Sequence, residues 1–119
     1  MLAPELGRLA FGSDFPNYDP DPLRGLYAAR TRGEETEGGP PSDRVPFPQT
    51  LDPLSALSGY TSGAAFACRQ DARRGRLSVG FAADLTVLTV DPIACAPEEL
   101  LDARVRMTVV NGEIVYRSP

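Results

Sequence analysis

The sequence predicts an α/β chain in which helices precede a strand-rich C-terminal third. Three observations indicate this fold class: an early apolar run that ends in a carboxylate, two segments with apolar residues at helical spacing, and a final third rich in β-branched residues. The chain has 119 residues, the length of one domain, of which 42% are hydrophobic and 24% charged. Such a composition is typical of a chain that folds around a core.

The early apolar run, Leu9 to Phe11, is closed by a Gly-Ser-Asp triplet ending at Asp14, and then by Pro16. This pattern predicts a buried strand of the parallel type with Asp14 at its carboxyl end. Because α/β folds place their chemistry at that end of a strand, Asp14 is the candidate catalytic residue. A turn residue beside a proline also bonds local backbone N–H groups, so a structural role for Asp14 stays open.

The first predicted helix begins at Asp21, as N-cap, and Pro22, as first helical residue. Its face follows the i, i+3, i+4, i+7 rule and consists of Leu23, Leu26, Tyr27 and Arg30. Gly33 is the natural stop. A long loop is then predicted over residues 33–50, because glycines, prolines and acidic residues dominate it. This loop either lines a substrate pocket or is a solvated insertion.

The second predicted helix begins in the same way, at Asp52 and Pro53. Its apolar face consists of Leu54, Leu57, Tyr60, Ala64 and Cys68. Gly59 and Gly63 lie inside this helix, where each costs about 1 kcal/mol relative to Ala. Their presence indicates close packing against another element.

The C-terminal third changes to strand patterns. Residues 85–90 are aliphatic or β-branched on both faces and predict a strand that is covered on both sides. Pro97, followed by Glu98 and Glu99, begins a short helix whose acids lie at its positive end.

A hairpin is the strongest local prediction, because Asn111-Gly112 separates two apolar runs, 104–110 and 113–117, as in a type I′ turn. A two-residue turn places Val110 opposite Glu113, Val109 opposite Ile114, Thr108 opposite Val115 and Met107 opposite Tyr116. One face of the hairpin then consists of Val105, Met107, Val109, Ile114 and Tyr116.

Composition excludes several kinds of chemistry. The chain contains no histidine and no lysine, and its 12 basic residues are all arginine. This excludes a Ser-His-Asp or Cys-His pair, a Schiff-base lysine, a histidine metal cage and a lysine-containing phosphate loop. Cys68 and Cys95 are far apart in sequence and are expected to be buried apolar residues with free thiols.

Charge and hydropathy also limit the partners. The net charge of −4 argues against nucleic acid as a partner. The one arginine cluster, at 69, 73, 74 and 76, is interrupted by Asp71, which favours a solvated turn over a phosphate site. No apolar run is long enough to span a membrane and no signal peptide is evident, so we expect a cytoplasmic chain without membrane partners.

Three of these segments resemble the amidohydrolase 3 family of metal-dependent hydrolases in the amidohydrolase superfamily. Residues 9–16, LAFGSDFP, with the following DPLRGLYAA at 21–29, resemble its GSD-x-P segment and next helix. GRLSVGFAADLTVL at 75–88 with Asp91-Pro92 resembles the family's G-x-L-x-x-G-x-x-A-D-L-x-V-L…D-P signature. VVNGEIVY at 109–116 resembles its closing hairpin. Together they cover nearly the whole chain in order.

The resemblance implies a C-terminal fragment of a (β/α)₈ barrel together with part of a small β-sandwich. Residues 1–74 would then be the end of the barrel, with its eighth strand, the following helices and the long loop. Residues 75–119 would be the C-terminal β-sandwich segment. Apolar side chains would face barrel partners that the chain lacks, which predicts self-association through exposed barrel edges; these are Leu9, Ala10, Phe11, Leu23, Leu26, Leu54 and Leu57.

The resemblance also implies a function. In the full-length family a divalent metal, usually zinc, and a small-molecule substrate meet at the barrel, and the Asp after the eighth strand approaches the metal and takes a proton from the attacking water. Asp14 matches that Asp as a catalytic and metal-binding residue. The family's other ligands are histidines and sometimes a carboxylated lysine. Because this chain has neither residue type, we expect no tight metal binding and no activity from it alone. The alternative is a stand-alone, non-catalytic association module.

Overall fold

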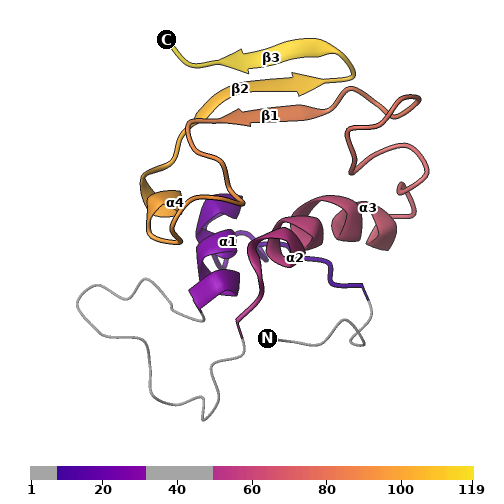
Figure 1. Ribbon diagram of the computed structural model, residues 1–119. Coiled ribbons are helices and arrows are strands. Elements are labelled where there is room, and N and C mark those ends of the chain that lie inside the picture. The colour runs from indigo at the N-terminus through magenta and orange to yellow at the C-terminus, as the bar shows by residue number, and fades with distance from the viewer. Residues whose placement is uncertain (1–7, 32–49) are drawn as a thin grey trace.

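The computed structural model describes residues 8–31 and 50–119, which form a layer of helices beside a three-stranded sheet (Figure 1). The helices are α1 (Pro22–Thr31), the consecutive α2 (Pro53–Ser58), η2 (Gly59–Gly63) and α3 (Ala64–Ala67), and the short α4 (Glu99–Asp102). The strands are β1 (Leu85–Leu88), β2 (Val105–Val110) and β3 (Glu113–Arg117). The prediction of a mixed α/β chain is confirmed. The sheet is antiparallel in the order β1-β2-β3.

Helix α1 begins as predicted, because the Asp21 carboxylate accepts the N–H of Leu23 at 2.9 Å and Pro22 is the first helical residue. Leu23 and Leu26 are buried in a core cluster with Ala56, Leu100 and Ala103. The expectation that these two leucines face absent partners is therefore wrong, since α2 and α4 of the same chain pack against α1. The stop at Gly33 and the loop of residues 33–50 lie outside the described residues, apart from Thr50.

The second helical run also begins as predicted, with the Asp52 carboxylate accepting the Ser55 N–H at 3.0 Å. Its buried positions differ from those predicted. Ala56, Gly59 and Gly63 are buried, whereas Leu54 is 63% exposed and Cys68 is exposed. The central segment η2 is π-helical. A π turn has more residues than the roughly 3.6 of an α-helical turn, so the residues after it no longer lie on the face predicted from α-helical spacing.

Two further predictions about buried residues are corrected. Cys68 lies beyond the end of α3 and is exposed, while Cys95 is half-buried; both thiols are free, as expected. The run Leu9 to Phe11 is not a strand. Leu9 and Phe11 are half-buried, Ala10 is exposed, and no described strand pairs with them, so their backbone lacks the ladder that defines a strand.

Strand β1 is shorter than predicted and is not covered on both faces. Thr86 is exposed and Val87 is 41% exposed. Of the described strand residues only Val109 is buried. The continuous apolar run at 85–90 therefore belongs to a sheet whose faces have little cover from the described part of the chain.

The hairpin is confirmed at its turn and altered beyond it. Asn111 (φ 50°) and Gly112 (φ 85°) both have the positive φ that a type I′ turn requires. Val110 pairs with Glu113 and Val109 with Ile114, as predicted. The register then shifts, so that Thr108 pairs with Tyr116 and Met107 with Arg117. Such a bulge places one extra residue in β3, and the predicted common face of the hairpin ends there.

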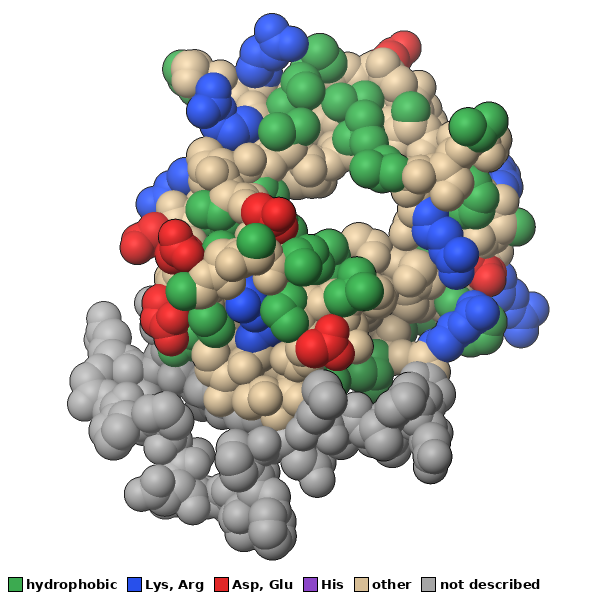
Figure 2. Space-filling view, viewed as in Figure 1, with side chains coloured by type: hydrophobic (Ala, Val, Ile, Leu, Met, Phe, Trp, Pro, Cys, Tyr) green, Lys and Arg blue, Asp and Glu red, His purple; other side chains and the backbone are tan. Residues whose placement is uncertain are grey.

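The sheet and the helices are joined more by the loops that connect them than by a shared hydrophobic core. Figure 2 shows an opening that passes between them, and the core cluster lies on the helical side of it. No helix within residues 8–31 and 50–119 combines the length and apolar character needed to cross a membrane.

Candidate functional site

Asp14, the candidate catalytic residue, lies in an exposed turn after residues 8–13. Its backbone is left-handed (φ 54°), a conformation that Asp tolerates better than most residues. Its carbonyl oxygen accepts the Asn17 N–H at 3.0 Å, and its Oδ2 accepts the Asn17 side-chain amide at 3.0 Å. Both bonds are of the kind that holds an ordinary residue in a turn. They also leave it exposed, with lone pairs able to accept a proton or bind a cation.

The segment that leads to Asp14 is seated on two helical glycines, Gly59 and Gly63, here called the glycine shelf. The Phe11 N–H donates to the Gly59 carbonyl at 3.0 Å, and the Phe11 ring lies against the Gly59 Cα. A Cβ at Gly59 would come 2.5 Å from the Phe11 Cδ2 atom, and a Cβ at Gly63 would overlap the Leu9 carbonyl oxygen. The prediction that these glycines permit close packing is confirmed, since only hydrogen fits beneath the segment.

Tyr60, between the shelf glycines, completes the support. Its ring packs against Phe11 with 5.3 Å between ring centroids. Partial burial raises the pKa of the Tyr60 hydroxyl, because the phenolate would be desolvated there. The Tyr60 hydroxyl also lies against Gly25 of α1, so that one side chain joins α1, η2 and the segment before Asp14.

The described residues contain no metal centre. Across residues 8–31 and 50–119, no group of three or more His, Cys, Asp or Glu side chains could hold a metal ion. Asp14 is thus a single oxygen donor, whereas a catalytic zinc site needs about three protein ligands.

A second polar cluster, missed by the sequence reasoning, surrounds Asp84 of the A-D-L motif. Its Oδ1 accepts the Asn111 N–H at 2.8 Å, and its Oδ2 lies 3.0 Å from the Arg74 guanidinium. The neighbouring Ala83 carbonyl accepts the Gly112 N–H at 3.0 Å. This cluster holds the hairpin turn against the loop after α3, so the motif has a structural role here. In sequence, Asp84 is only a short polar residue before a strand, and nothing in that pattern indicates its contacts with Asn111 and Arg74.

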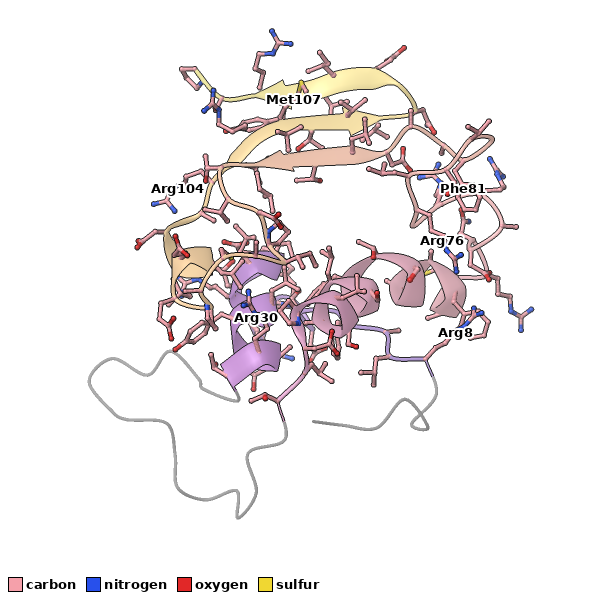
Figure 3. The ribbon with its side chains drawn as sticks, in the orientation of Figure 1. Arg8, Arg30, Arg76, Phe81, Arg104 and Met107 are labelled. Atoms are coloured by element: carbon pink, nitrogen blue, oxygen red, sulfur yellow. The ribbon has the colours of Figure 1, made fainter. Side chains whose placement is uncertain are left out.

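Arg30, a residue of the predicted α1 face, also has a structural role. Its guanidinium donates to the Cys95 carbonyl at 2.8 Å and to the Pro92 carbonyl at 3.3 Å, which joins α1 to the loop before α4 (Figure 3).

An N-terminal segment ending in an exposed carboxylate, two helical runs and a closing antiparallel hairpin make this a mixed α/β chain, and within its described residues Asp14 has no further metal-ligating groups around it. The family model described as "Amidohydrolase family" matches residues 6–116. The chain belongs to this amidohydrolase family.

Two curated relatives are similar over most of this chain. The protein named "Putative amidohydrolase YtcJ" of Bacillus subtilis (strain 168) is 37% identical over 107 residues, which are 90% of this chain and 20% of that protein. The N-substituted formamide deformylase of Arthrobacter pascens is 31% identical over 109 residues, 92% of this chain and 19% of that protein. The chain therefore spans about a fifth of the length of these relatives.

Among solved structures, the amidohydrolase from Thermotoga maritima MSB8 is similar at 23% identity with a TM-score of 0.46. The similarity covers 54% of this chain and 15% of that one.

Proposed function

We propose that this chain forms the C-terminal part of a metal-dependent amidohydrolase that hydrolyses non-peptide carbon–nitrogen bonds, and that it is inactive alone. The observation that supports this proposal is a family match over residues 6–116 in a chain that spans about a fifth of its relatives. The isolated position of Asp14 agrees with it, because a complete hydrolytic site needs more donors than the described residues provide.

In this proposal residues 9–13 would form the eighth strand of a (β/α)₈ barrel once the rest of the enzyme supplies neighbouring strands, and residues up to 74 would be the end of that barrel. The half-buried side chains of Leu9 and Phe11, and the absence of a described strand beside them, suit a strand whose neighbours belong to the rest of the enzyme. Residues 75–119 are then part of a β-sandwich, and the exposed faces of β1–β3 suit a second sheet.

Asp14 would contribute one carboxylate to the active site. The donor set of residues 8–31 and 50–119 does not fit a complete metal site, so the remaining ligands would come from outside these residues. The role open to Asp14 itself is that of general base: its exposed carboxylate accepts the proton of the attacking water. Asn17 orients that carboxylate through the 3.0 Å bond to Oδ2 and leaves Oδ1 available.

N-substituted formamides are the first substrate class to test, because one relative is named as a deformylase of such compounds. The purified chain, with added Zn²⁺ or Mn²⁺, should hydrolyse neither these formamides nor other amides, esters or carbamates above the rate without protein. Calorimetric titration should detect no tight Zn²⁺ binding. Turnover by the chain alone that disappears in Asp14→Asn, with Asp19→Asn as the matched control, would contradict the proposed inactivity.

The second candidate function is a non-catalytic association module. The observation that favours it is the number of exposed large apolar side chains in so short a chain, among them Phe66, Leu77 and Val79.

A further inference from the structure

Arginines gather at the end of the molecule formed by α3 and the loop that follows it. Figure 2 shows basic side chains at this end, and Figure 3 places Arg8 and Arg76 beside α3. We call this surface the basic corner; it consists of Arg8, Arg69, Arg73, Arg74 and Arg76.

Only two of these arginines have an acidic partner in the described ranges. Arg8 pairs with Asp71 at 3.4 Å, and Arg74 pairs with Asp84 at 3.0 Å. The exposed side chains of Arg69, Arg73 and Arg76 form no ion pair with any acidic side chain that the structure describes. The corner therefore keeps an excess of positive charge in a chain whose net charge is −4.

Apolar side chains lie among these arginines. Phe66 is 48% exposed beneath the Arg8 guanidinium, which lies 4.2 Å from its ring centroid. Leu77 is 78% exposed and Val79 is fully exposed, on the loop that carries Arg76. An apolar centre with an arginine-rich rim and an aromatic residue is the composition that protein interfaces favour. The basic corner thus has the character of a docking surface for an acidic, partly apolar partner.

The opposite end of the chain has the complementary character. Acidic residues gather around α4 and the loop before it, where Figure 2 shows acidic side chains. We call this surface the acidic corner; it consists of Asp91, Glu98, Glu99 and Asp102, with Ile93 38% exposed among them. Arg104, which follows α4 in sequence, donates to the backbone carbonyls of Asp102 and Ala103 at 3.2 and 3.0 Å.

We propose that the basic corner binds the acidic corner of a second copy of this chain. Charge complementarity identifies the occupant: each copy carries both surfaces, at opposite ends, and each surface includes at least one exposed apolar side chain. A contact between two different surfaces is heterologous, so copies add head to tail and form open chains rather than a closed two-fold dimer. This inference does not rest on the hydrolase proposal; it makes specific the association named as the second candidate function, by assigning the two surfaces that meet.

The salt dependence and the concentration dependence of association test the proposal. In sedimentation velocity at about 20 mM NaCl, the chain should form species that grow with protein concentration, and about 500 mM NaCl should remove them. A chain that stays monomeric at low salt up to millimolar concentration would overturn the proposal. Association that is equally strong at high and low salt would also overturn it, since the contact would then not depend on these charges.

Charge-reversal variants locate the contact. Arg73→Glu with Arg76→Glu removes most of the positive charge of the basic corner, and Glu98→Arg with Asp102→Arg neutralises the acidic corner. Each variant alone should associate at least about tenfold more weakly, because one of its two complementary surfaces has lost its charge. A mixture of the two should recover association, because the unmodified acidic corner of the first variant can meet the unmodified basic corner of the second. Failure of the mixture to associate would refute the head-to-tail contact.

A matched control separates the contact from net charge. Arg106→Glu with Arg117→Glu changes the net charge as the basic-corner variant does, but on the sheet, and should associate as the unmodified chain does. Far-UV circular dichroism of each variant checks folding; the mixture adds a second check, since unfolded variants would not restore each other. Equal loss of association in the sheet variant would refute the assignment to the corners.

Discussion

Substitution of Gly63 by alanine tests whether the segment before Asp14 is seated on the glycine shelf. A Cβ at Gly63 would overlap the Leu9 carbonyl oxygen and lie 3.0 Å from the Leu9 carbonyl carbon and 3.1 Å from the Ser58 carbonyl oxygen. All three are backbone atoms, so no rotamer change relieves the clash. The segment that carries Asp14 must move away from η2.

Two opposing effects set the free energy of unfolding of Gly63→Ala. Alanine stabilises a helix interior by about 1 kcal/mol relative to glycine. Overpacking of a well-fitted contact costs about 1 to 3 kcal/mol. Because the clash is with backbone, we take the upper part of that range and expect a net loss of about 1 to 2 kcal/mol. Urea unfolding followed by circular dichroism measures it.

The sign of the effect is decisive. If residues 8–13 did not rest on the shelf, Gly63→Ala would instead stabilise the chain by about 1 kcal/mol, and that result would refute the assignment. The neighbouring Ser62→Ala is the control, with an expected gain of a few tenths of a kcal/mol from helix propensity. Amide NMR shifts of Phe11 and Asp14 should change in Gly63→Ala and stay constant in the control.

Three further outcomes are expected. Gly112→Val should cost about 1 to 3 kcal/mol of stability by denaturation, because valine resists the φ of 85° at an otherwise open position, while Arg117→Gln should change little. Asp84→Ala should cost about 1 to 2 kcal/mol of stability, because the Asn111 N–H and the Arg74 guanidinium lose their acceptor. The control is Asp71→Ala, which removes the partner of Arg8 in a more exposed ion pair and should cost less than about 1 kcal/mol. Equal losses in the two variants would argue against the Asp84 cluster. Two hydrogen bonds hold the pKa of the Asp52 carboxyl below its ordinary value of 3.8: the bond from the Ser55 hydroxyl has the larger effect, and the bond from the Ser55 N–H the smaller. The stability that Asp52 contributes is therefore present above that value and lost as pH falls through the lower folded pKa, so Asp52→Asn should flatten the acid limb of a stability–pH curve.

The sequence predicts the local devices of this fold well. Asp21 and Asp52 cap helices because a side chain bonds an N–H two or three residues away, and Asn111-Gly112 turns because both residues accept positive φ. These signals need only neighbours along the chain. The prediction of close packing at Gly59 and Gly63 also succeeded, because an unfavourable residue inside a helix indicates a packing requirement.

Features that depend on distant partners were predicted poorly. The run Leu9 to Phe11 has a strand composition, but a strand needs a neighbour, and here a helix supports it. The π-helical η2 displaces Cys68 from the expected buried face, and no local residue pattern indicates it. For the candidate site, Asp14 was predicted from its place after an apolar run and from the family resemblance; neither its left-handed backbone nor its bond to Asn17 could be inferred from composition or spacing.

The central claim is that Asp14 is the catalytic carboxylate which this chain contributes to an amidohydrolase. The most direct measurement is kcat/KM for deformylation by the Arthrobacter pascens enzyme in which this chain replaces the matching fifth. We expect turnover by the graft and by its exposed-carboxylate control Asp19→Asn, and a loss of at least about 100-fold in Asp14→Asn. Equal kcat/KM for the Asp14→Asn graft and the unmodified graft would contradict the claim.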